Sequence, residues 1–245
     1  MTVIDYNLQA VRHAIALAAR KARRRTEDIT LLAVSKSFPA SAIREACQAG
    51  QSIFGENYLQ EALRKMKALH DLPLEWHFIG PIQGNKCAAI AEHFAWVHSV
   101  DRFRIAERLS VQRTRHMPPL NVCIQVNIGG ETTKGGVLPG ELEELAMAVA
   151  GLPNLKLRGL MVIPPPAEGL LEQCRPFAEL RGLLQQLNQS GLGLDTLSMG
   201  MSNDLEAAVM EGATIVRIGT AVFGVRTQHK GGDQDVISMN NPKSA

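Results

Sequence analysis

Short segments rich in β-branched and aromatic residues alternate with amphipathic segments along most of the chain, and this alternation constrains the fold more than any other feature. Strands are predicted at 29–35, 51–54, 75–79, 96–100, 120–126, 155–161, 195–198 and 214–217. Helices are predicted at 8–24, 40–49, 58–69, 102–115, 140–150, 170–188 and 203–211. Eight strands with intervening helices in 245 residues are typical of an α/β chain that forms a single (β/α)8 barrel, here with an extra N-terminal helix.

A doubly wound open sheet is the alternative, because it shows the same alternation. Such a sheet usually has a glycine-rich dinucleotide turn after its first strand. This chain instead has Lys36 there, followed by Ser37-Phe38-Pro39. The barrel is therefore favoured as one domain over 1–227, and the polar segment 228–245, which loses all periodicity, is expected to be a flexible tail.

Lys36 follows the apolar segment 29–35 directly. Removal of an ammonium group from water disfavours its charged form, so a lysine at the end of a buried strand is expected to be partly neutral and nucleophilic toward an aldehyde. A lysine that points into water is the alternative when this residue is considered alone.

Glycine and small polar residues follow the seventh and eighth predicted strands, where many barrels bind a phosphate group. Gly200 and Gly219 let the backbone approach a ligand closely. Ser202 offers a hydroxyl, and Thr220 together with Gly219 offers backbone N–H groups. Helix capping and a tight turn explain either loop by itself, but both loops together with Lys36 predict a site for an aldehyde that carries a phosphate.

Composition and motifs exclude several other classes of protein. The formal net charge of +2 predicts no general attraction to nucleic acid, and the basic cluster 20–25 is interpreted as a solvated helix end. No apolar segment approaches the roughly 20 residues that span a bilayer. The four scattered cysteines and the N-terminal residues, which resemble no signal peptide, predict a reducing cytoplasm. The histidines show no metal-binding spacing, and neither a GxSxG motif nor a kinase motif occurs.

Seven motifs, in order, carry a resemblance to a known family. They are Ala33-Val34-Ser35-Lys36, Phe54-Gly55-Glu56-Asn57-Tyr58, Trp76-His77-Phe78-Ile79-Gly80, Val126-Asn127-Ile128, Gly159-Leu160-Met161, Ser198-Met199-Gly200-Met201-Ser202-Asn203-Asp204 and Val216-Arg217-Ile218-Gly219-Thr220. The chain resembles the YggS-like pyridoxal phosphate homeostasis proteins, whose fold is similar to the barrel domain of alanine racemase, called fold type III. Gly84, where many relatives have serine, and the stiff segment Pro164-Pro165-Pro166 depart from the pattern and affect the expected shape of the rim.

The resemblance implies a cofactor, pyridoxal 5′-phosphate (PLP), bound to Lys36 as an internal aldimine. It implies that Ser202, Gly219 and Thr220 hold the phosphate, with Met201 also among the cofactor-binding residues. Arg217 is implied near the pyridine nitrogen, and Asn57 and His77 near the ring. Lys134 is expected either to reach the mouth of the site or to be an ordinary exposed lysine.

The resemblance also implies the function. It indicates a cytoplasmic, monomeric protein that carries and buffers PLP without turnover of its own, with PLP-dependent apoenzymes as candidate recipients. A PLP-dependent amino-acid racemase is the alternative; racemases of this fold take a second base from an added β-domain across a dimer, and this chain is expected to end with the barrel. A class I aldolase shares the barrel and the lysine, but its lysine usually comes from a later strand.

Overall fold

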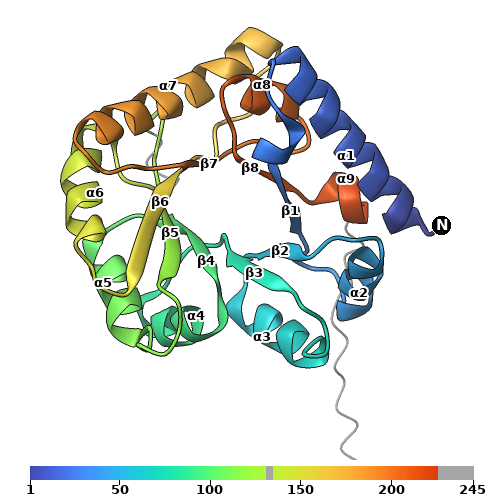
Figure 1. The fold of residues 1–245 in the computed structure, drawn as a ribbon, viewed down its shortest axis with the longest axis horizontal. Coiled ribbons are helices and arrows are strands. Elements are labelled where there is room, and N and C mark those ends of the chain that lie inside the picture. Colours follow the sequence, from blue (N-terminus) through green and yellow to red (C-terminus); the bar gives the residue numbers. More distant parts are fainter. Residues whose placement is uncertain (131–134, 226–245) are drawn as a thin grey trace, which may run out of the picture.

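The computed structural model describes residues 1–130 and 135–225, which form a closed barrel of parallel strands surrounded by helices (Figure 1). The strands are β1 (Thr30–Val34), β2 (Ile53–Glu56), β3 (Glu75–Phe78), β4 (Trp96–Val100), β5 (Leu120–Gln125), β6 (Leu155–Met161), β7 (Thr196–Ser198) and β8 (Ile215–Ile218). Each strand pairs with the next, and β8 pairs with β1 from Thr30↔Ile215 to Ala33↔Ile218, which closes the sheet. The predicted (β/α)8 barrel is confirmed.

A helix follows every strand, and one helix precedes them all. The α-helices are α1 (Val3–Lys21), α2 (Ala40–Gln48), α3 (Leu59–Ala68), α4 (Cys87–His93), α5 (Phe103–Gln112), α6 (Leu142–Ala150), α7 (Leu170–Gln189), α8 (Leu205–Met210) and α9 (Thr220–Phe223). Short 3-10 helices are η1 (Thr26–Asp28), η2 (Gly84–Lys86) and η3 (Pro139–Glu141). The sequence patterns did not predict α4, because seven residues give too few turns for a helical period to stand out.

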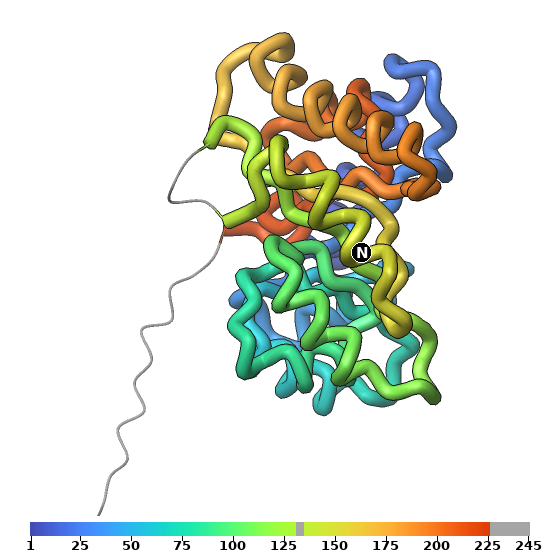
Figure 2. Tube along the Cα trace, turned by 90° about the vertical axis from the view of Figure 1, so that its left-hand side faces the viewer, coloured from blue at the N-terminus to red at the C-terminus, as the bar shows by residue number. Residues whose placement is uncertain are grey.

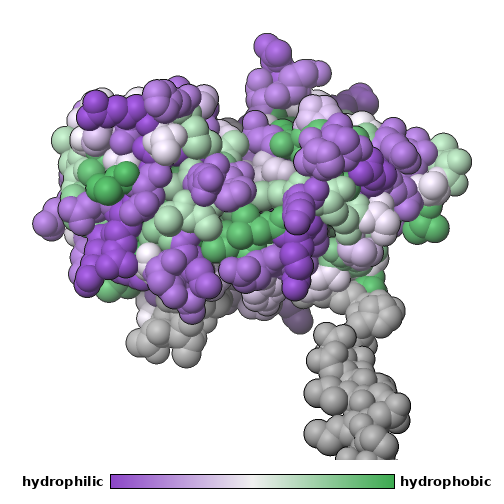
Figure 3. Space-filling view, turned by 90° about the horizontal axis from the view of Figure 1, so that it is seen from below, coloured by the Kyte–Doolittle hydropathy of each residue, from purple (hydrophilic) through white to green (hydrophobic). Residues whose placement is uncertain are grey.

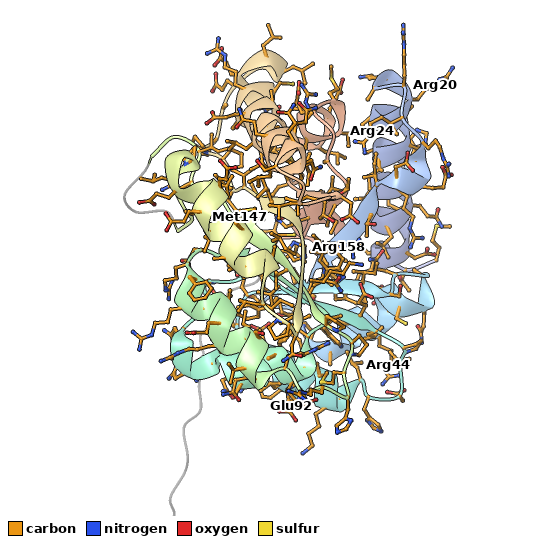
Figure 4. All side chains as sticks on the ribbon, turned by 60° about the vertical axis from the view of Figure 1, so that its left-hand side comes forward. Arg20, Arg24, Arg44, Glu92, Met147 and Arg158 are labelled. Atoms are coloured by element: carbon orange, nitrogen blue, oxygen red, sulfur yellow. The ribbon has the colours of Figure 1, made fainter. Side chains whose placement is uncertain are left out.

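The extra helix α1 closes the ring of helices between the last and first repeats. The Oγ1 atom of Thr2 accepts a hydrogen bond from the N–H of Asp5, 3.2 Å away, which caps the helix and places its start before the predicted residue 8. Its buried face packs against α2, α8 and α9 (Figure 1). Near its end, Lys21 pairs with Glu206 of α8 at 2.8 Å. Arg20 extends away from the molecule, as predicted for a solvated helix end (Figure 4).

The main apolar core lies between the outer face of the sheet and the helices. Its largest fully buried side chains include Phe54, Phe94 and Phe177. A smaller cluster, which contains Leu32 and Ile79, fills part of the barrel interior. Polar side chains dominate the outer face shown in Figure 3, with apolar ones in small groups between them. The apolar core between sheet and helices is thus the larger one, and apolar side chains fill only part of the barrel interior.

The carboxyl ends of the strands lie at one end of the barrel, on the left in the side view of Figure 2, where the loop after β6 and the chain at residue 225 are found. All four cysteines are free thiols. Among the described residues, no helix is long and apolar enough to cross a membrane, and no cluster of His, Cys, Asp or Glu could hold a metal ion. Lys134 and the tail predicted at 228–245 lie outside the described residues.

Candidate functional site

The carboxyl ends of β1, β2, β7 and β8 surround a cavity of about 510 Å³, a size typical of small-molecule sites. It is lined by Val34, Lys36, Asn57, Ile79, Ile163, Met201, Ser202, Asn203, Arg217, Gly219, Thr220 and Ala221. The structure therefore brings together seven of the predicted site residues, all except His77. A smaller hollow of about 150 Å³ lies where the loop at 164–166 meets Met201 and Asn203, so this proline-rich loop forms part of the rim.

Lys36 reaches the cavity because β1 ends just before it. The N–H of Ser35 still donates to the carbonyl oxygen of Gly55, at 3.0 Å, which extends the pairing of β1 with β2 beyond Val34. The chain then leaves the sheet at Ser37, which has a left-handed φ of 68°. The N–H of Ser37 donates to Glu61 Oε1 at 2.6 Å. Lys36 is thus held between a strand end and an anchored turn, and its half-buried side chain extends into the cavity.

A buried ion pair fixes the ends of β1 and β2. Glu56 is fully buried, and its Oε1 atom accepts hydrogen bonds from Ser35 Oγ at 2.6 Å and from Lys65 Nζ at 2.7 Å. Lys65 also donates to the carbonyl oxygen of Ser35 at 2.8 Å and to Glu61 at 2.5 Å. Burial raises the pKa of Glu56, and the charge of Lys65 opposes that shift. The network ties both strand ends to α3, so the residues that follow these strands have fixed positions.

The loop after β7 depends on Gly200. Its φ is 91°, and a Cβ atom there would lie only 2.4 Å from the Cβ of Ala208 in α8, so glycine is required for this close approach. The N–H of Met201 donates to Asp204 Oδ1 at 2.5 Å, which closes the loop just before α8 begins. Ser202 lies inside this closed turn and lines the cavity.

The loop after β8 also approaches β1 closely. A Cβ atom on Gly219 would lie 3.2 Å from the carbonyl oxygen of Val34. The short helix α9 begins at Thr220, and the first N–H groups of a helix have no intrahelical partner. The ring of Phe223 in α9 stacks on Phe38 at 5.0 Å, which ties this helix to the loop that follows Lys36.

Arg217 is held from the barrel interior. Its Nη1 atom donates to Ser198 Oγ at 2.9 Å, and its Nη2 atom donates to the carbonyl oxygen of Val162 at 2.7 Å. Burial lowers the pKa of Arg217 to about 10, against the raising effect of Asp204 and Cys123. The guanidinium group therefore stays protonated at neutral pH and can only donate hydrogen bonds to a ligand.

The expectation that His77 lies near the ligand is not supported by its place in β3. Its side chain is in the barrel interior, with Nδ1 2.9 Å from His98 Nε2 and Nε2 2.8 Å from Glu75 Oε1. The residue that reaches the cavity here is Ile79, which directly follows β3 and lies two positions beyond His77 on the same face. His77 therefore lies below the cavity and supports the site without lining it.

Sequence reasoning did not predict five of the lining residues, which are Val34, Ile79, Ile163, Asn203 and Ala221. Ile163 follows β6 closely, so the rule that strand ends form the site could have found it. It also missed Glu56 and Lys65, because a carboxylate and an amine that far apart in sequence give no local signal. Residue patterns reveal side chains that line a site more readily than side chains that support it.

Three comparisons place the chain among known proteins. The family model described as "Alanine racemase, N-terminal domain" matches residues 6–227. A Pseudomonas aeruginosa protein named pyridoxal phosphate homeostasis protein is 61% identical over 226 residues, which cover 92% of this chain and 97% of that one. The Escherichia coli K12 protein of the same name is 52% identical over 233 residues, covering 94% of this chain and 100% of that one.

Solved structures agree with these relatives. PipY of Synechococcus elongatus, solved without PLP, has a TM-score of 0.81 at 40% identity and covers 90% of this chain and 100% of its own. The same protein solved with PLP bound has a TM-score of 0.75 at 41% identity, over 86% and 100% of the two chains. Alanine racemase from Corynebacterium glutamicum, at 20% identity and a TM-score of 0.68 over 89% of this chain and 62% of its own, shares the fold. The chain therefore belongs to the alanine racemase N-terminal domain family and, within it, to the pyridoxal phosphate homeostasis proteins.

Proposed function

We propose that this chain binds pyridoxal 5′-phosphate and serves intracellular PLP homeostasis as a carrier and buffer, with no catalytic turnover of its own. One observation carries the proposal: Lys36 and the glycine-bearing loops after β7 and β8 converge on one cavity of suitable size. The names of the relatives and the PLP-bound structure of PipY support it.

The residues of the cavity fit the cofactor. Bound PLP supplies an aldehyde that condenses with an amine, and an aromatic ring that carries a phosphate. Asn57 Oδ1 is buried and has no hydrogen-bond partner among the described residues, so it is available to a ligand donor such as a ring hydroxyl. Gly219, Thr220 and Ser202 offer backbone and hydroxyl donors to a dianion. Arg217 offers donors to a ring nitrogen that keeps its lone pair.

Lys36 is proposed as the point of covalent attachment. The lone pair of its Nζ atom would bond to the aldehyde carbon, the two amine hydrogens would leave with the aldehyde oxygen as one water molecule, and a carbon–nitrogen double bond would remain. The anchored turn at Ser37 fixes the start of the side chain, so the amine approaches the aldehyde from a defined direction.

A binding role is favoured over racemisation by the cavity itself. Racemisation requires bases on opposite faces of the substrate carbon. Of the described residues that line the cavity, Lys36 alone carries a base of ordinary strength, because the only other ionisable side chain is Arg217. The protonated guanidinium also disfavours a protonated ring nitrogen, which weakens the ring as an electron sink.

The proposal includes a monomer in the cytoplasm that passes PLP to PLP-dependent apoenzymes. A cytoplasmic location is consistent with four cysteines that are all free thiols. Light scattering of the purified protein tests the monomer. Transfer is tested by mixing the PLP-loaded protein with an apoenzyme that has no activity of its own until it receives the cofactor.

Reduction with borohydride followed by mass spectrometry tests the attachment. The expected result is one PLP adduct on Lys36, and its loss in Lys36→Ala, with minor adducts on exposed lysines. Lys67→Ala is the matched control, since Lys67 is an exposed lysine of α3. Retention of the full adduct in Lys36→Ala would overturn the assignment of the lysine.

The same preparation tests the phosphate loops and the absence of turnover. Charge-assisted hydrogen bonds contribute about 1.5–3 kcal/mol each, so pyridoxal without its phosphate should bind at least about tenfold more weakly than PLP. Equal affinities would exclude the phosphate site. Saturable racemase, transaminase or decarboxylase activity that disappears in Lys36→Ala would favour the enzyme instead.

A further inference from the structure

The barrel interior contains a line of polar side chains, where barrels usually contain layers of branched apolar ones. Glu75 and His77 come from β3, His98 from β4, Ser198 from β7 and Arg217 from β8. Four of the five are buried, and Glu75 is half-exposed at the amino end of the strands, opposite the cavity. We call this set of five residues the interior column.

Consecutive hydrogen bonds join the whole column. Arg217 Nη1 lies 2.9 Å from Ser198 Oγ, and Ser198 Oγ lies 2.7 Å from His98 Nδ1. His98 Nε2 lies 2.9 Å from His77 Nδ1, and His77 Nε2 lies 2.8 Å from Glu75 Oε1. The column therefore runs without a break from the ligand cavity to the opposite end of the barrel.

The donors and acceptors can be assigned along the column. Burial lowers the pKa of both histidines, so each ring is neutral and has one N–H donor and one acceptor nitrogen. The Glu75 carboxylate can only accept, so His77 Nε2–H donates to it and His77 Nδ1 is an acceptor. His98 Nε2–H then donates to His77 Nδ1, which leaves His98 Nδ1 to accept from the Ser198 hydroxyl, and Arg217 Nη1–H donates to Ser198 Oγ. Every proton is used once, and every bond points from the guanidinium toward the carboxylate.

We propose that Ser198, His98, His77 and Glu75 are positioning residues for Arg217, and that Glu75 fixes the direction of the hydrogen bonds from the far end of the barrel. A carboxylate can only accept, so it selects the tautomer of His77, and His77 in turn selects that of His98. In the selected tautomer His98 Nδ1 is unprotonated and accepts the hydroxyl hydrogen of Ser198, so this hydrogen points away from Arg217 and an oxygen lone pair faces its Nη1–H. The donors of Arg217 that remain then face the cavity in one orientation.

The groups around the column favour the same arrangement. The carboxyl of Asp204 lies close enough to Arg217 to favour its positive charge. The ring of Trp96 stacks on His77 at 5.3 Å, and Arg158 lies 4.8 Å above Trp96 and pairs with Asp195. Trp96 thus contacts the column through its ring, and among the described ionic groups Glu75 alone is hydrogen-bonded to either histidine.

The inference rests on the proposed function, because it concerns the affinity for PLP. Ser198→Ala removes the acceptor of Arg217 and should weaken PLP binding about tenfold, the factor expected for one buried hydrogen bond. Ser110→Ala is the matched control, since Ser110 is a buried, hydrogen-bonded serine outside the column. It should leave the affinity unchanged.

Glu75 gives the sharper pair of variants, because it is half-exposed and its replacement leaves the core intact. Glu75→Gln keeps an oxygen acceptor for His77 and should bind PLP like the parent protein. Glu75→Ala loses the acceptor and should bind PLP about threefold more weakly, although it lies at the opposite end of the barrel. Equal affinity of Glu75→Ala and the parent protein would overturn the proposal.

A measurement without cofactor separates this inference from the proposed function. Nitrogen-15 NMR of the imidazole rings in the PLP-free protein should show Nε2–H and unprotonated Nδ1 on both His77 and His98. The opposite tautomer on either ring would overturn the proposed order of hydrogen bonds in the column, even if the protein binds PLP. Failure of the parent protein to bind PLP would overturn the proposed function, while these tautomers would still test the column.

Discussion

The two ends of the barrel are built in opposite ways from the same sheet. At the carboxyl end, glycines at 200 and 219 bring the backbone close and leave a cavity open. At the amino end, the guanidinium of Arg158 (labelled in Figure 4) stacks on the ring of Trp96 and pairs with the carboxylate of Asp195. Close backbone approach therefore leaves room for a ligand at the carboxyl end, whereas contacts between side chains dominate the amino end.

The largest expected effect comes from the buried pair that supports the open end. Lys65→Met leaves the fully buried Glu56 without its partner and should lower the free energy of unfolding by about 3–5 kcal/mol. Urea unfolding measures this loss of stability. Lys21→Met is the matched control, because it breaks an ion pair whose side chains are 60% and 43% exposed, and it should change stability little. Equal losses in the two variants would show that the rim does not depend on the buried pair.

A second prediction concerns the close approach at Gly200. Alanine there takes a left-handed φ, which costs about 1–2 kcal/mol, and overlaps Ala208, which costs about 1–3 kcal/mol more. Gly191→Ala is the control, since Gly191 has a φ of 93° and nothing within 4 Å of the added Cβ. Gly200→Ala should therefore lower the free energy of unfolding by both amounts, and Gly191→Ala by the cost of the left-handed φ alone. PLP binding should weaken in Gly200→Ala alone, and a loss of affinity in both would contradict the role of the close approach.

The open end was largely predictable from sequence, because strand ends in a parallel barrel share one edge. Lys36, Ser202 and Gly219 each follow an apolar segment, and the closure of the sheet brings them together. Strand limits were less accurate where function interrupts the pattern. The second strand was predicted to end at residue 54, but β2 continues through Gly55 and Glu56, a glycine and a buried carboxylate that look like a turn in sequence.

The interior was not predictable in the same way. His77 and His98 stand in strands whose patterns show only which residues alternate, and hydrogen bonds between different strands depend on register. His77 was therefore identified from its motif and placed too close to the ligand, whereas Ser198 and His98 were not identified at all. The barrel had to close before their partners could be known.

A third prediction uses the two interior histidines. Burial lowers the pKa of both from about 6.5, so below that pH the unfolded chain binds protons that the folded protein does not. Stability should therefore fall as the pH falls from about 6.5 to about 5, with a limiting slope of about 1.4 kcal/mol per pH unit for each histidine. Urea unfolding over this range measures the slope. His98→Gln should remove the contribution of one histidine to this slope. A flat profile in the parent protein would mean that the rings can be charged in the fold.

The smallest expected effect comes from Arg158, which lies at the same end of the barrel as Glu75 but outside the interior column. Arg158→Lys keeps the charge but loses the planar fork that binds Asp195 and most of the stacking on Trp96. It should lower the free energy of unfolding by about 1 kcal/mol, since a cation–π contact contributes about 0.5–1 kcal/mol at a partly exposed site. Affinity for PLP should not change, because Arg158 donates no hydrogen bond to the interior column. If Arg158→Lys weakens PLP binding as much as Glu75→Ala does, any disturbance of the amino end is transmitted to the cavity by packing, and the hydrogen bonds of the column have no special part in it.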